Sequence, residues 1–409
     1  MSVGNNIPNG WEETTLGEVA DVIMGQSPKG DTCNQNNQGI PLLNGPTEFG
    51  ELHPSPVQFT TDPKRLSNIN DLLFCVRGST TGRMNWSNQQ YAIGRGIAAI
   101  RHKRGVKYRK FIKGIFDFKL KRLLAEATGS TFPNVSRSQL ENININLPPL
   151  PEQKAIAAIL TAFDDKIELL QEQNKTLEAT AQTIFKEWFG KYQIGDELPD
   201  GWRVGKLGEL ALKISKGTTP RKKDLEGLPI EIPFLKVKDI SNEGLISKNN
   251  LELIPKEVHV KQLQRSILET NDILFSIAGT IGRVAIVDDE LNNSNCNQAL
   301  AFIRLNDKIT FREYVHLWLK SKEIQDEINN CIVQGVQANI SLAVLSNLVI
   351  NIPDISTLNN WKELIKPIYS KLETNNAQIQ TLKQTRDTLL PKLMSGQLRV
   401  DEFKESAVC

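Results

Sequence analysis

The 409-residue sequence carries one series of short motifs twice, in the same order. Chance similarity of turn residues would not preserve that order, so we interpret the chain as two copies of one structural unit. The residues between the motifs differ between the copies. The shared motifs are Pro-(Asn/Asp)-Gly-Trp at 8–11 and 199–202, Leu-Gly-Glu at 16–18 and 207–209, Gly-x-(Ser/Thr)-Pro at 25–28 and 217–220, Asn-Asp-(Leu/Ile)-Leu-Phe at 70–74 and 271–275, Gly-Arg at 82–83 and 282–283, and Asn-(Val/Ile)-Ser at 134–136 and 339–341.

Each copy has the pattern of a globule that contains both helices and strands. Alternating apolar residues at 71–76 and 272–277 predict strands, and the Gly and Pro residues between such segments predict turns. An amphipathic helix is predicted at 109–127 in the first copy and at 311–330 in the second. A short alternating segment then leads through proline into a long helix. We therefore expect an α+β (mixed α/β) fold class with two similar globular domains.

Two long segments have the apolar spacing of a coiled coil. Core-type positions step by four and three residues through each segment, which favours a coiled coil over a single amphipathic surface helix. Two bundle helices that pack separately on their own globules are the alternative. The positions are Ile156, Leu160, Phe163, Ile167, Leu170, Asn174, Leu177, Ala181, Ile184 and Trp188 in the first segment, and Trp361, Ile365, Ile368, Leu372, Asn375, Ile379, Leu382, Arg386, Leu389 and Leu393 in the second.

The polar exceptions in this spacing predict that the helices pair antiparallel. With Asn174 opposite Asn375, the two amides meet each other instead of facing leucine, where an unpaired amide would be costly. The same register places Trp188 opposite Trp361. Because proline removes a helix hydrogen bond, we expect Pro367 to kink the second helix or to delay its start.

The repeats and the helices together predict five segments. The paired helices would form a rod of roughly 48 Å at 1.5 Å per residue, with an approximate two-fold axis between the globules. One layer of the rod is unfavourable, because Arg386 would face Phe163 and must reach solvent. The segments are a first globular domain (1–150), a central long helix (151–192), a second globular domain (193–356), a C-terminal long helix (357–398) and a tail (399–409).

The sequence lacks the residue patterns of a catalytic or metal site. Its five cysteines contain no CxxC pair and its four histidines form no ligand pattern, which excludes a disulfide scaffold and a standard zinc site. The Gly-rich segment 78–83 lacks the lysine of a nucleotide-binding loop, so we interpret it as a structural or DNA-facing loop. The sequence shows neither a secretory signal nor an apolar run of about eighteen residues. We expect a cytoplasmic protein that is not an enzyme by itself.

Positive charge is concentrated in the first copy. The net charge of the chain is only +2, but residues 1–150 contain 17 basic and 12 acidic residues, a net of +5. Residues 191–356 contain 20 basic and 22 acidic residues, a net of −2. Two globules held apart by a rod suit a DNA site in two parts, because DNA presents equivalent half-sites about 34–36 Å apart. Since the copies diverge, the two half-sites should differ.

The chain resembles the specificity subunits of type I restriction-modification systems over nearly its full length. The specific matches are Leu-Pro-Pro-Leu-Pro-Glu-Gln at 147–153, before the central helix, and Arg-Asp-Thr-Leu-Leu-Pro-Lys-Leu-Met-Ser-Gly at 386–396. The repeated Gly-Trp…Leu-Gly-Glu openings and the Asn-Asp-(Leu/Ile)-Leu-Phe strands are also similar to that family. The second copy departs after Pro353, where Asp354-Ile355 replaces the usual Pro-Leu and the Glu-Gln pair is missing.

The resemblance implies two target recognition domains, each of which reads one half of an interrupted double-stranded DNA site. It also implies that the coiled coil sets the spacing and binds two methyltransferase subunits, and that restriction/translocase subunits join for restriction. S-adenosylmethionine, ATP and Mg²⁺ would then belong to the partner subunits, with no cofactor in this chain. The alternative function is a scaffold protein that recruits partners through its coiled coil without reading a DNA sequence.

Candidate DNA contacts are basic or amide side chains near the shared motifs and in the basic segment 101–122, since Lys and Arg bind phosphates and polar side chains read base edges. A solvated helix face is the alternative for the basic segment. Helix caps and turns are the alternative at the Asn-(Val/Ile)-Ser motif. The candidates are Arg83, Arg101, Lys103, Arg104, Lys107, Arg109, Lys110, Ser136, Arg137, Arg221, Lys222, Lys223, Arg283, Gln337 and Asn339.

Overall fold

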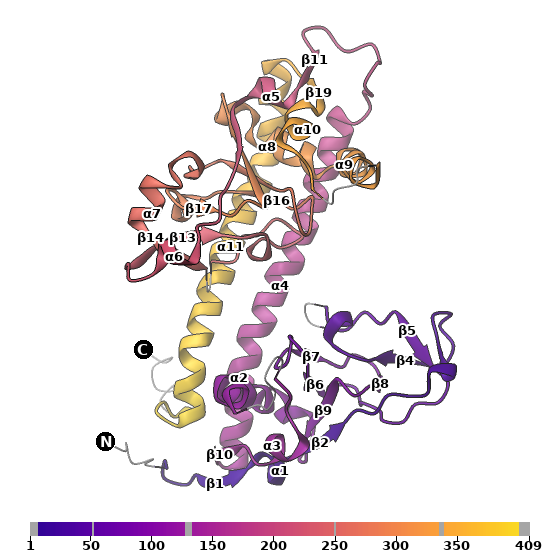
Figure 1. Ribbon diagram of the computed structural model, residues 1–409. Helices are drawn as coiled ribbons and strands as arrows, with labels where there is room; N and C mark the ends of the chain where they lie inside the picture. The colour runs from indigo at the N-terminus through magenta and orange to yellow at the C-terminus, as the bar shows by residue number, and fades with distance from the viewer. Residues whose placement is uncertain (1–6, 51–52, 127–132, 249–250, 335–338, 401–409) are drawn as a thin grey trace. The chain divides into compact units, whose positions relative to one another are not determined.

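The computed structural model describes residues 7–50, 53–126, 133–248, 251–334 and 339–400. The chain divides into two compact units (Figure 1). Unit 1 comprises residues 1–167 and 382–409, and unit 2 comprises residues 168–381. Each unit therefore contains one copy of the repeat together with part of both long helices.

Unit 1 is built around a four-stranded antiparallel sheet with the strand order β2-β9-β6-β7. A smaller sheet has the order β3-β5-β4-β8, and β1 pairs with β10. The strands are β1 (Glu12–Thr15), β2 (Ala20–Met24), β3 (Cys33–Asn34), β4 (Ile40–Leu43), β5 (Gln58–Thr60), β6 (Leu72–Cys75), β7 (Met84–Trp86), β8 (Ala92–Ile93), β9 (Ile97–His102) and β10 (Asn144–Leu147). The helices are α1 (Leu16–Val19), α2 (Arg109–Ala125), α3 (Arg137–Glu141) and the first part of α4 (Leu150–Phe189).

Unit 2 repeats this arrangement. Its main sheet has the order β12-β18-β15-β16, a smaller sheet has the order β14-β13-β17, and β11 pairs with β19. The strands are β11 (Arg203–Lys206), β12 (Ala211–Lys216), β13 (Ile230–Leu235), β14 (Glu252–Pro255), β15 (Ile273–Ser276), β16 (Val284–Ile286), β17 (Asn295–Cys296), β18 (Leu300–Leu305) and β19 (Val349–Ile352). The helices are α5 (Leu207–Leu210), α6 (Lys222–Leu225), α7 (Lys256–Lys261), α8 (Lys308–Lys320), α9 (Lys322–Gln334), α10 (Leu342–Asn347) and most of α11 (Ile355–Ser395).

One of the two inner strands of each main sheet, β6 in unit 1 and β15 in unit 2, is buried on both faces. In β6, Leu72 and Phe74 face the cluster that includes α2 and the long helices, while Leu73 faces the cluster under the smaller sheet. Leu274 of β15 likewise faces a different cluster from its neighbours. The alternating apolar pattern correctly predicted both strands, and their position between two helical or sheet layers explains why no residue of either strand reaches solvent.

The helix predicted at 311–330 is in fact two helices, so this prediction is wrong. Helix α8 ends at Lys320 and α9 begins at Lys322. Between them Ser321 has extended backbone angles (φ −64°, ψ 149°), and its hydroxyl donates a hydrogen bond of 2.7 Å to the Trp318 carbonyl. A serine side chain that bonds to the backbone competes with the helical pattern, which explains the break.

Helix α11 shows that Pro367 does not delay the helix start. The helix begins at Ile355, and Pro367 lies exposed within it. Asp354 accepts a hydrogen bond of 3.0 Å from the Thr357 backbone N–H, which is the geometry of an N-terminal cap. The Asp354 carboxylate therefore caps the start of the second long helix.

Candidate nucleic-acid interface

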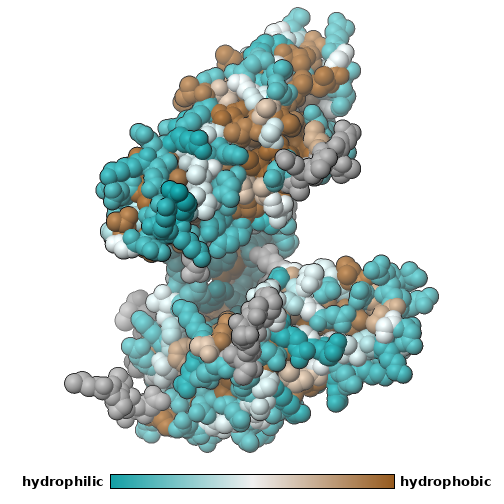
Figure 2. Space-filling model, in the orientation of Figure 1, coloured by the Kyte–Doolittle hydropathy of each residue, from teal (hydrophilic) through white to brown (hydrophobic). Residues whose placement is uncertain are grey.

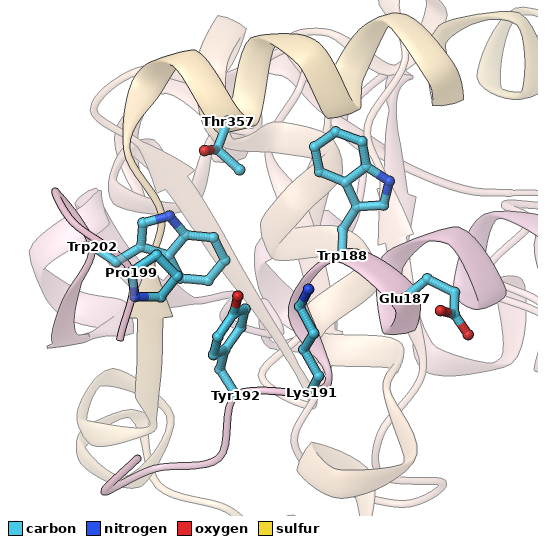
Figure 3. A pocket seen from close by; sticks show the side chains of 7 residues that line it. All are labelled: Glu187, Trp188, Lys191, Tyr192, Pro199, Trp202 and Thr357. Atoms are coloured by element: carbon cyan, nitrogen blue, oxygen red, sulfur yellow. The ribbon is translucent and has the colours of Figure 1, made fainter. Parts of the chain in front are cut away.

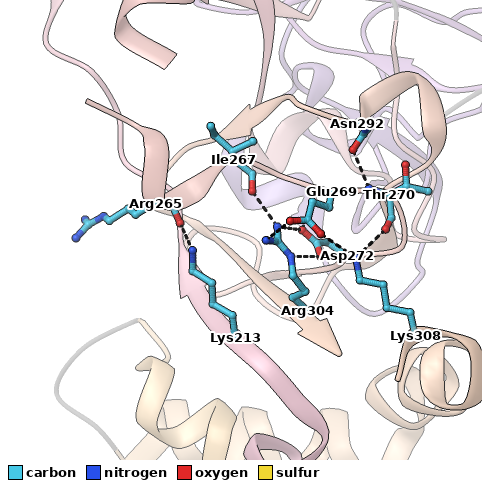
Figure 4. A network of polar contacts seen from close by, with 9 residues as sticks. All are labelled: Lys213, Arg265, Ile267, Glu269, Thr270, Asp272, Asn292, Arg304 and Lys308. Atoms are coloured by element: carbon cyan, nitrogen blue, oxygen red, sulfur yellow. Dashed lines mark hydrogen bonds and ion pairs between the residues drawn. The ribbon is translucent and has the colours of Figure 1, made fainter. Parts of the chain in front are cut away.

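Several residues predicted to contact DNA form bonds within their own domain, and the same kinds of pair recur in both copies. In unit 1 the Arg101 guanidinium donates to the buried carboxylate of Asp71 at 2.7 Å. In unit 2 Arg304 donates to Asp272 through two nitrogens, at 2.9 and 2.7 Å (Figure 4). Burial raises the pKa of Asp71 above its ordinary value, although the guanidinium opposes this shift. The Asp of the repeated Asn-Asp motif is thus the partner of an arginine on the neighbouring strand.

The arginine of the repeated Gly-Arg motif also bonds to its own domain. Arg83 donates to the Phe49 carbonyl at 2.6 Å, and Arg283 donates to the Ile240 carbonyl at 2.6 Å. Both carbonyls follow a short 3₁₀ helix, Pro46–Glu48 in unit 1 and Val237–Asp239 in unit 2. Each of the two arginines therefore binds the backbone at the end of the equivalent 3₁₀ helix in its own domain. Their predicted DNA contacts stay a prediction.

Two further cations of the basic segment are bonded inside unit 1. Arg109 donates to the side chain of Asn70, and Arg312 donates to Asn271 at the equivalent place in unit 2. Both asparagines have positive φ, 70° and 71°, a conformation that asparagine adopts more readily than most residues. Lys110 bonds to Asp164 of α4 at 2.7 Å.

The other predicted contacts differ in how available they are. Lys103, Arg104 and Lys107 are all exposed, and Lys103 donates to the Gly17 carbonyl at 2.6 Å. Lys222 and Lys223 are exposed at the start of α6, next to an Arg221–Asp224 ion pair of 3.2 Å. These exposed cations are the predicted residues with the freest access to a phosphate.

The Asn-(Val/Ile)-Ser motif supplies helix caps. The Ser136 hydroxyl accepts a hydrogen bond from the backbone of Gln139 at 3.2 Å and caps α3, and Ser341 caps α10 in the same way. Arg137 is held by Glu141 one turn away. Asn339 is exposed and its backbone bridges to Ala278. Gln337 lies outside the described residues.

Sequence reasoning missed the turn that joins the smaller sheet to the main sheet. Arg95 lies exposed at this turn in unit 1, and Gln298 lies exposed at the equivalent turn in unit 2. Exposed Lys29 and Arg65 belong to neighbouring loops in unit 1. The visible face of the lobe that carries β4, β5 and β8 is mainly hydrophilic (Figure 2). The repeated Gly-x-(Ser/Thr)-Pro motif was the available signal, because its loop packs on this turn.

The long helices pair antiparallel within each unit. In unit 2 the Asn375 amide donates to the Asn174 side chain at 2.8 Å, and Asn174 donates to Asn376 at 2.7 Å. Ile156, Leu160, Ile167, Leu170, Ile365, Ile379 and Leu393 are buried, while Phe163, Leu177, Ile184, Ile368, Leu372, Leu382 and Leu389 are partly buried. The asparagine layer thus has the predicted register.

The predicted pairing of Trp188 with Trp361 across the helices is replaced, among the described residues, by ring contacts of Trp361 with other aromatic side chains. Trp361 is fully buried and contacts the rings of Phe185 and Phe189, with centroid distances of 6.0 and 5.1 Å. Beyond Ala181 the buried side of α4 shifts by one residue, because this end of the helix packs into the core of unit 2. Trp188 is left partly exposed.

Trp188 forms one wall of an open hollow of about 420 Å³ in unit 2 (Figure 3). Tyr192 and Trp202 pack edge to face at its other side, with ring centroids 5.0 Å apart. The hollow has aromatic walls, one carboxylate (Glu187) and one ammonium group (Lys191). Its lining residues do not include a nucleophile in contact with a base. Its lining residues are Glu187, Trp188, Lys191, Tyr192, Pro199, Trp202 and Thr357.

In unit 1 the arginine of the helix seam is paired with a carboxylate. Arg386 donates to Asp164 at 2.9 Å, and Asp164 also accepts from Lys110. Burial alone would raise the pKa of the Asp164 carboxyl, but the two cations outweigh this effect and hold that pKa below its ordinary value. The layer predicted to be unfavourable at Phe163 is therefore satisfied by the next residue of α4.

The Pro-Glu-Gln motif joins α4 to three other parts of unit 1. Glu152 accepts from the Trp11 indole N–H at 3.0 Å and pairs with Arg399 at 2.8 Å. Gln153 is buried and bonds to His102 at 3.0 Å. Leu393 at the end of α11 is buried in the same core. The last turns of α11 and Arg399 therefore belong to the same domain as Trp11.

Among the described residues, no three His, Cys, Asp or Glu side chains gather as a metal site. No helix in the described part of the chain is long and apolar enough to cross a membrane.

Comparisons with known proteins identify the family. The Type I restriction modification DNA specificity domain matches residues 8–179 and 199–385, one segment for each copy. The MjaIX specificity subunit of a type I restriction enzyme from Methanocaldococcus jannaschii is 30% identical over 290 residues, which are 67% of this chain and 65% of that protein. The chain thus matches just under two thirds of that relative's length. The MjaVIII specificity subunit from the same organism is 24% identical over 416 residues, 97% of this chain and 95% of that protein.

A solved structure has the same fold. It is the crystal structure of a type I restriction-modification system S subunit from M. genitalium, with a TM-score of 0.52 and 17% sequence identity, covering 96% of this chain and 98% of that one. Because the family matches both copies of the repeat and most of the sequence, the chain belongs to the type I restriction-modification DNA specificity family.

Proposed function

We propose that this chain is the DNA-recognition subunit of a type I restriction-modification complex. Unit 1 reads one half of a bipartite asymmetric site in double-stranded DNA, and unit 2 reads the other half. The observation that carries this proposal is that the two segments matched by the specificity family fall on two copies of one fold. The copies keep the same scaffold but present different exposed side chains, so their half-sites should differ.

The long helices supply the spacing and the docking surface for partners. Helices α4 and α11 are continuous over Leu150–Phe189 and Ile355–Ser395 and pair antiparallel. Two methyltransferase subunits bind along them, and restriction/translocase subunits join for restriction. The chain itself is not an enzyme: S-adenosylmethionine, ATP and Mg²⁺ belong to those partners, in the cytoplasm of the cell.

Mapping of methylated adenines across the genome tests this proposal. Cells that carry the chain together with its methyltransferase should methylate adenines only within one bipartite motif, whereas cells without the chain should not. Weak DNA binding with no sequence preference, or methylation without a bipartite motif, would favour a scaffold that recruits partners without reading DNA.

Exchange of one domain tests the division of labour. Residues 1–150 from a relative with another site, introduced together with that relative's residues 382–409, should change one half-site and leave the other unchanged. The C-terminal segment must be included because Leu393, Met394 and Val400 belong to the core of unit 1. A graft that altered both halves, or neither, would contradict the two-reader proposal.

A further inference from the structure

The missed turn between the two sheets has the same backbone in both units. It spans four residues, closed by a hydrogen bond of 3.1 Å from the Ile97 N–H to the Gly94 carbonyl in unit 1. The bond from Leu300 to Asn297 in unit 2 also measures 3.1 Å. The backbone N–H of the first turn residue donates to the carbonyl of the last residue of the neighbouring strand. This bond runs from Gly94 to Leu43 of β4 at 2.8 Å, and from Asn297 to Leu235 of β13 at 2.9 Å. The two turns are therefore equivalent positions on one scaffold.

The glycine of the repeated Gly-x-(Ser/Thr)-Pro motif brings a loop directly onto this turn. A Cβ atom on Gly25 would lie 2.1 Å from the Gly94 carbonyl oxygen, and one on Gly217 would lie 1.9 Å from the Cys296 carbonyl oxygen. Real Cβ atoms do not approach so closely, so only glycine fits at both places. The two glycines explain why this motif recurs.

The loop then places a hydroxyl beside the side chain at the tip of the turn. In unit 1 the Arg95 Nε donates to the Ser27 hydroxyl at 3.3 Å. In unit 2 the Thr219 hydroxyl donates to the side-chain oxygen of Gln298. One atom of each tip side chain, Nε of Arg95 and Oε1 of Gln298, is therefore held by a hydrogen bond to the loop. Within the described part of the chain, the structure records no hydrogen bond from the terminal nitrogens of Arg95 or from the amide nitrogen of Gln298.

The residue at the tip of the turn differs between the two copies, although the fold around it is the same. Where an arginine bonds inside its own domain, the other copy also has an arginine at the equivalent position, as in the Arg101–Asp71 and Arg304–Asp272 pairs. By contrast, Arg95 and Gln298 are different residue types. Yet both are exposed, both lie on a turn with the same backbone hydrogen bonds, and both contact a hydroxyl group of the neighbouring loop. A side chain that varies on a fixed scaffold is suited to set specificity rather than stability.

The chemistry of the two tips fits two different bases. An arginine presents two parallel donors that match O6 and N7 of guanine in the major groove, whereas a glutamine amide matches N6 and N7 of adenine. Exposed cations lie on the segments next to each turn and can bind the adjacent phosphates. These cations are Lys29 and Arg65 in unit 1, and Arg221, Lys222, Lys223 and Arg265 in unit 2.

We propose that Arg95 and Gln298 are base-reading residues, with Arg95 selecting guanine in one half-site and Gln298 selecting adenine in the other. This proposal rests on the proposed function in DNA recognition and names the positions at which the two units acquire different specificities.

The test uses the full-length chain with its methyltransferase and a library of sites in which each base pair of each half is varied. Arg95→Gln should lower the preference for guanine at one position of one half-site by roughly tenfold to a hundredfold. Gln298→Arg should change adenine to guanine at one position of the other half-site. Arg95→Ala, which only truncates an exposed side chain, should remove the preference without replacing it.

Arg77→Gln is the matched control, because Arg77 is another exposed arginine of unit 1 and receives the same substitution. It should leave every base preference unchanged. If the Arg95 variants weaken methylation of all sites equally, Arg95 contacts a phosphate and the proposal is wrong. It is also wrong if base preferences stay the same in the Arg95 and Gln298 variants. If the unaltered chain itself shows no bipartite preference, the proposed function fails instead.

Discussion

The side chains of Asn174 in α4 and Asn375 in α11 form a hydrogen bond of 2.8 Å across the helix pair. Both side chains are buried, and Asn174 also donates to Asn376. A polar layer of this kind costs stability relative to leucine but specifies one register, because any shift would place a buried amide against an apolar side chain. The layer therefore defines how the two long helices are aligned.

Replacing both asparagines with leucine should raise the stability of the helix pair, at the risk of register slippage. Asn174→Leu or Asn375→Leu alone should destabilise by about 1–3 kcal/mol, because each removes one partner of the buried hydrogen bond between the two side chains. Thermal melts of the three variants measure the order. Gln173→Leu, on the exposed side of α4, is the control and should change stability by only about 0.5 kcal/mol. Single variants milder than the double would count against this pairing.

Asp164→Asn should destabilise unit 1 in a manner that depends on pH. The folded-state pKa of Asp164 lies below its ordinary value of 3.8, despite burial, because Lys110 and Arg386 bind the carboxylate. A lowered pKa stabilises the fold at pH values above the ordinary one, and this stabilisation is lost as pH falls through the folded-state pKa. We expect a loss of about 1–3 kcal/mol at pH 7.

Denaturant unfolding of the variant and the unaltered chain between pH 7 and pH 2.5 measures this dependence. The difference between them should be constant above about pH 4 and should shrink below it. Asp165→Asn, at the exposed neighbouring residue, is the matched control. A difference that grew on acidification would mean that the carboxylate is not held ionised by its two cations.

Glu152→Ala should destabilise unit 1 because three parts of the chain meet at this carboxylate. The substitution leaves the Trp11 indole N–H without its acceptor and Arg399 without its ion-pair partner. The Glu152 side chain is only 13% exposed, so we expect a loss of about 1–3 kcal/mol. Urea unfolding measures it, with Glu172→Ala as the control because that side chain is 62% exposed. Equal effects of the two substitutions would contradict the role given to Glu152.

Lengthening both helices should change the spacing of the two half-sites. One heptad inserted in each helix beside Asn174 and Asn375 keeps the apolar pattern and lengthens the pair by about 10 Å. At roughly 3.4 Å per base pair, the best spacer should grow by at most about three base pairs. The inserted heptad also rotates the helix end by about 20°, which supercoiling should absorb.

Methylation of a series of sites that differ only in spacer length measures the shift. The half-site sequences should stay the same, because no recognition loop is altered. If the lengthened chain folds and methylates but still prefers the original spacer, the helices do not set the distance between the half-sites.

The repeat, the strands of each main sheet and the long antiparallel helices could be predicted from the sequence alone. These features depend on residues close together in the chain, such as the four-and-three spacing of apolar residues, which generates a helix face directly. The Asn174–Asn375 pairing was also predictable, since two polar residues in apolar seams admit one favourable register. The break at Ser321 was not, because the apolar pattern of α8 and α9 continues across a residue whose hydroxyl ends the first helix.

The bonding partners of the arginines were decided only by the tertiary structure. The sequence shows that Arg83, Arg101 and Arg109 are basic, but it does not show that a carbonyl or a carboxylate far along the chain lies within hydrogen-bonding distance of each. Likewise, Arg386 finds Asp164 more than two hundred residues away. The partner of a long charged side chain depends on which distant segments fold against it, and local spacing carries no record of those contacts.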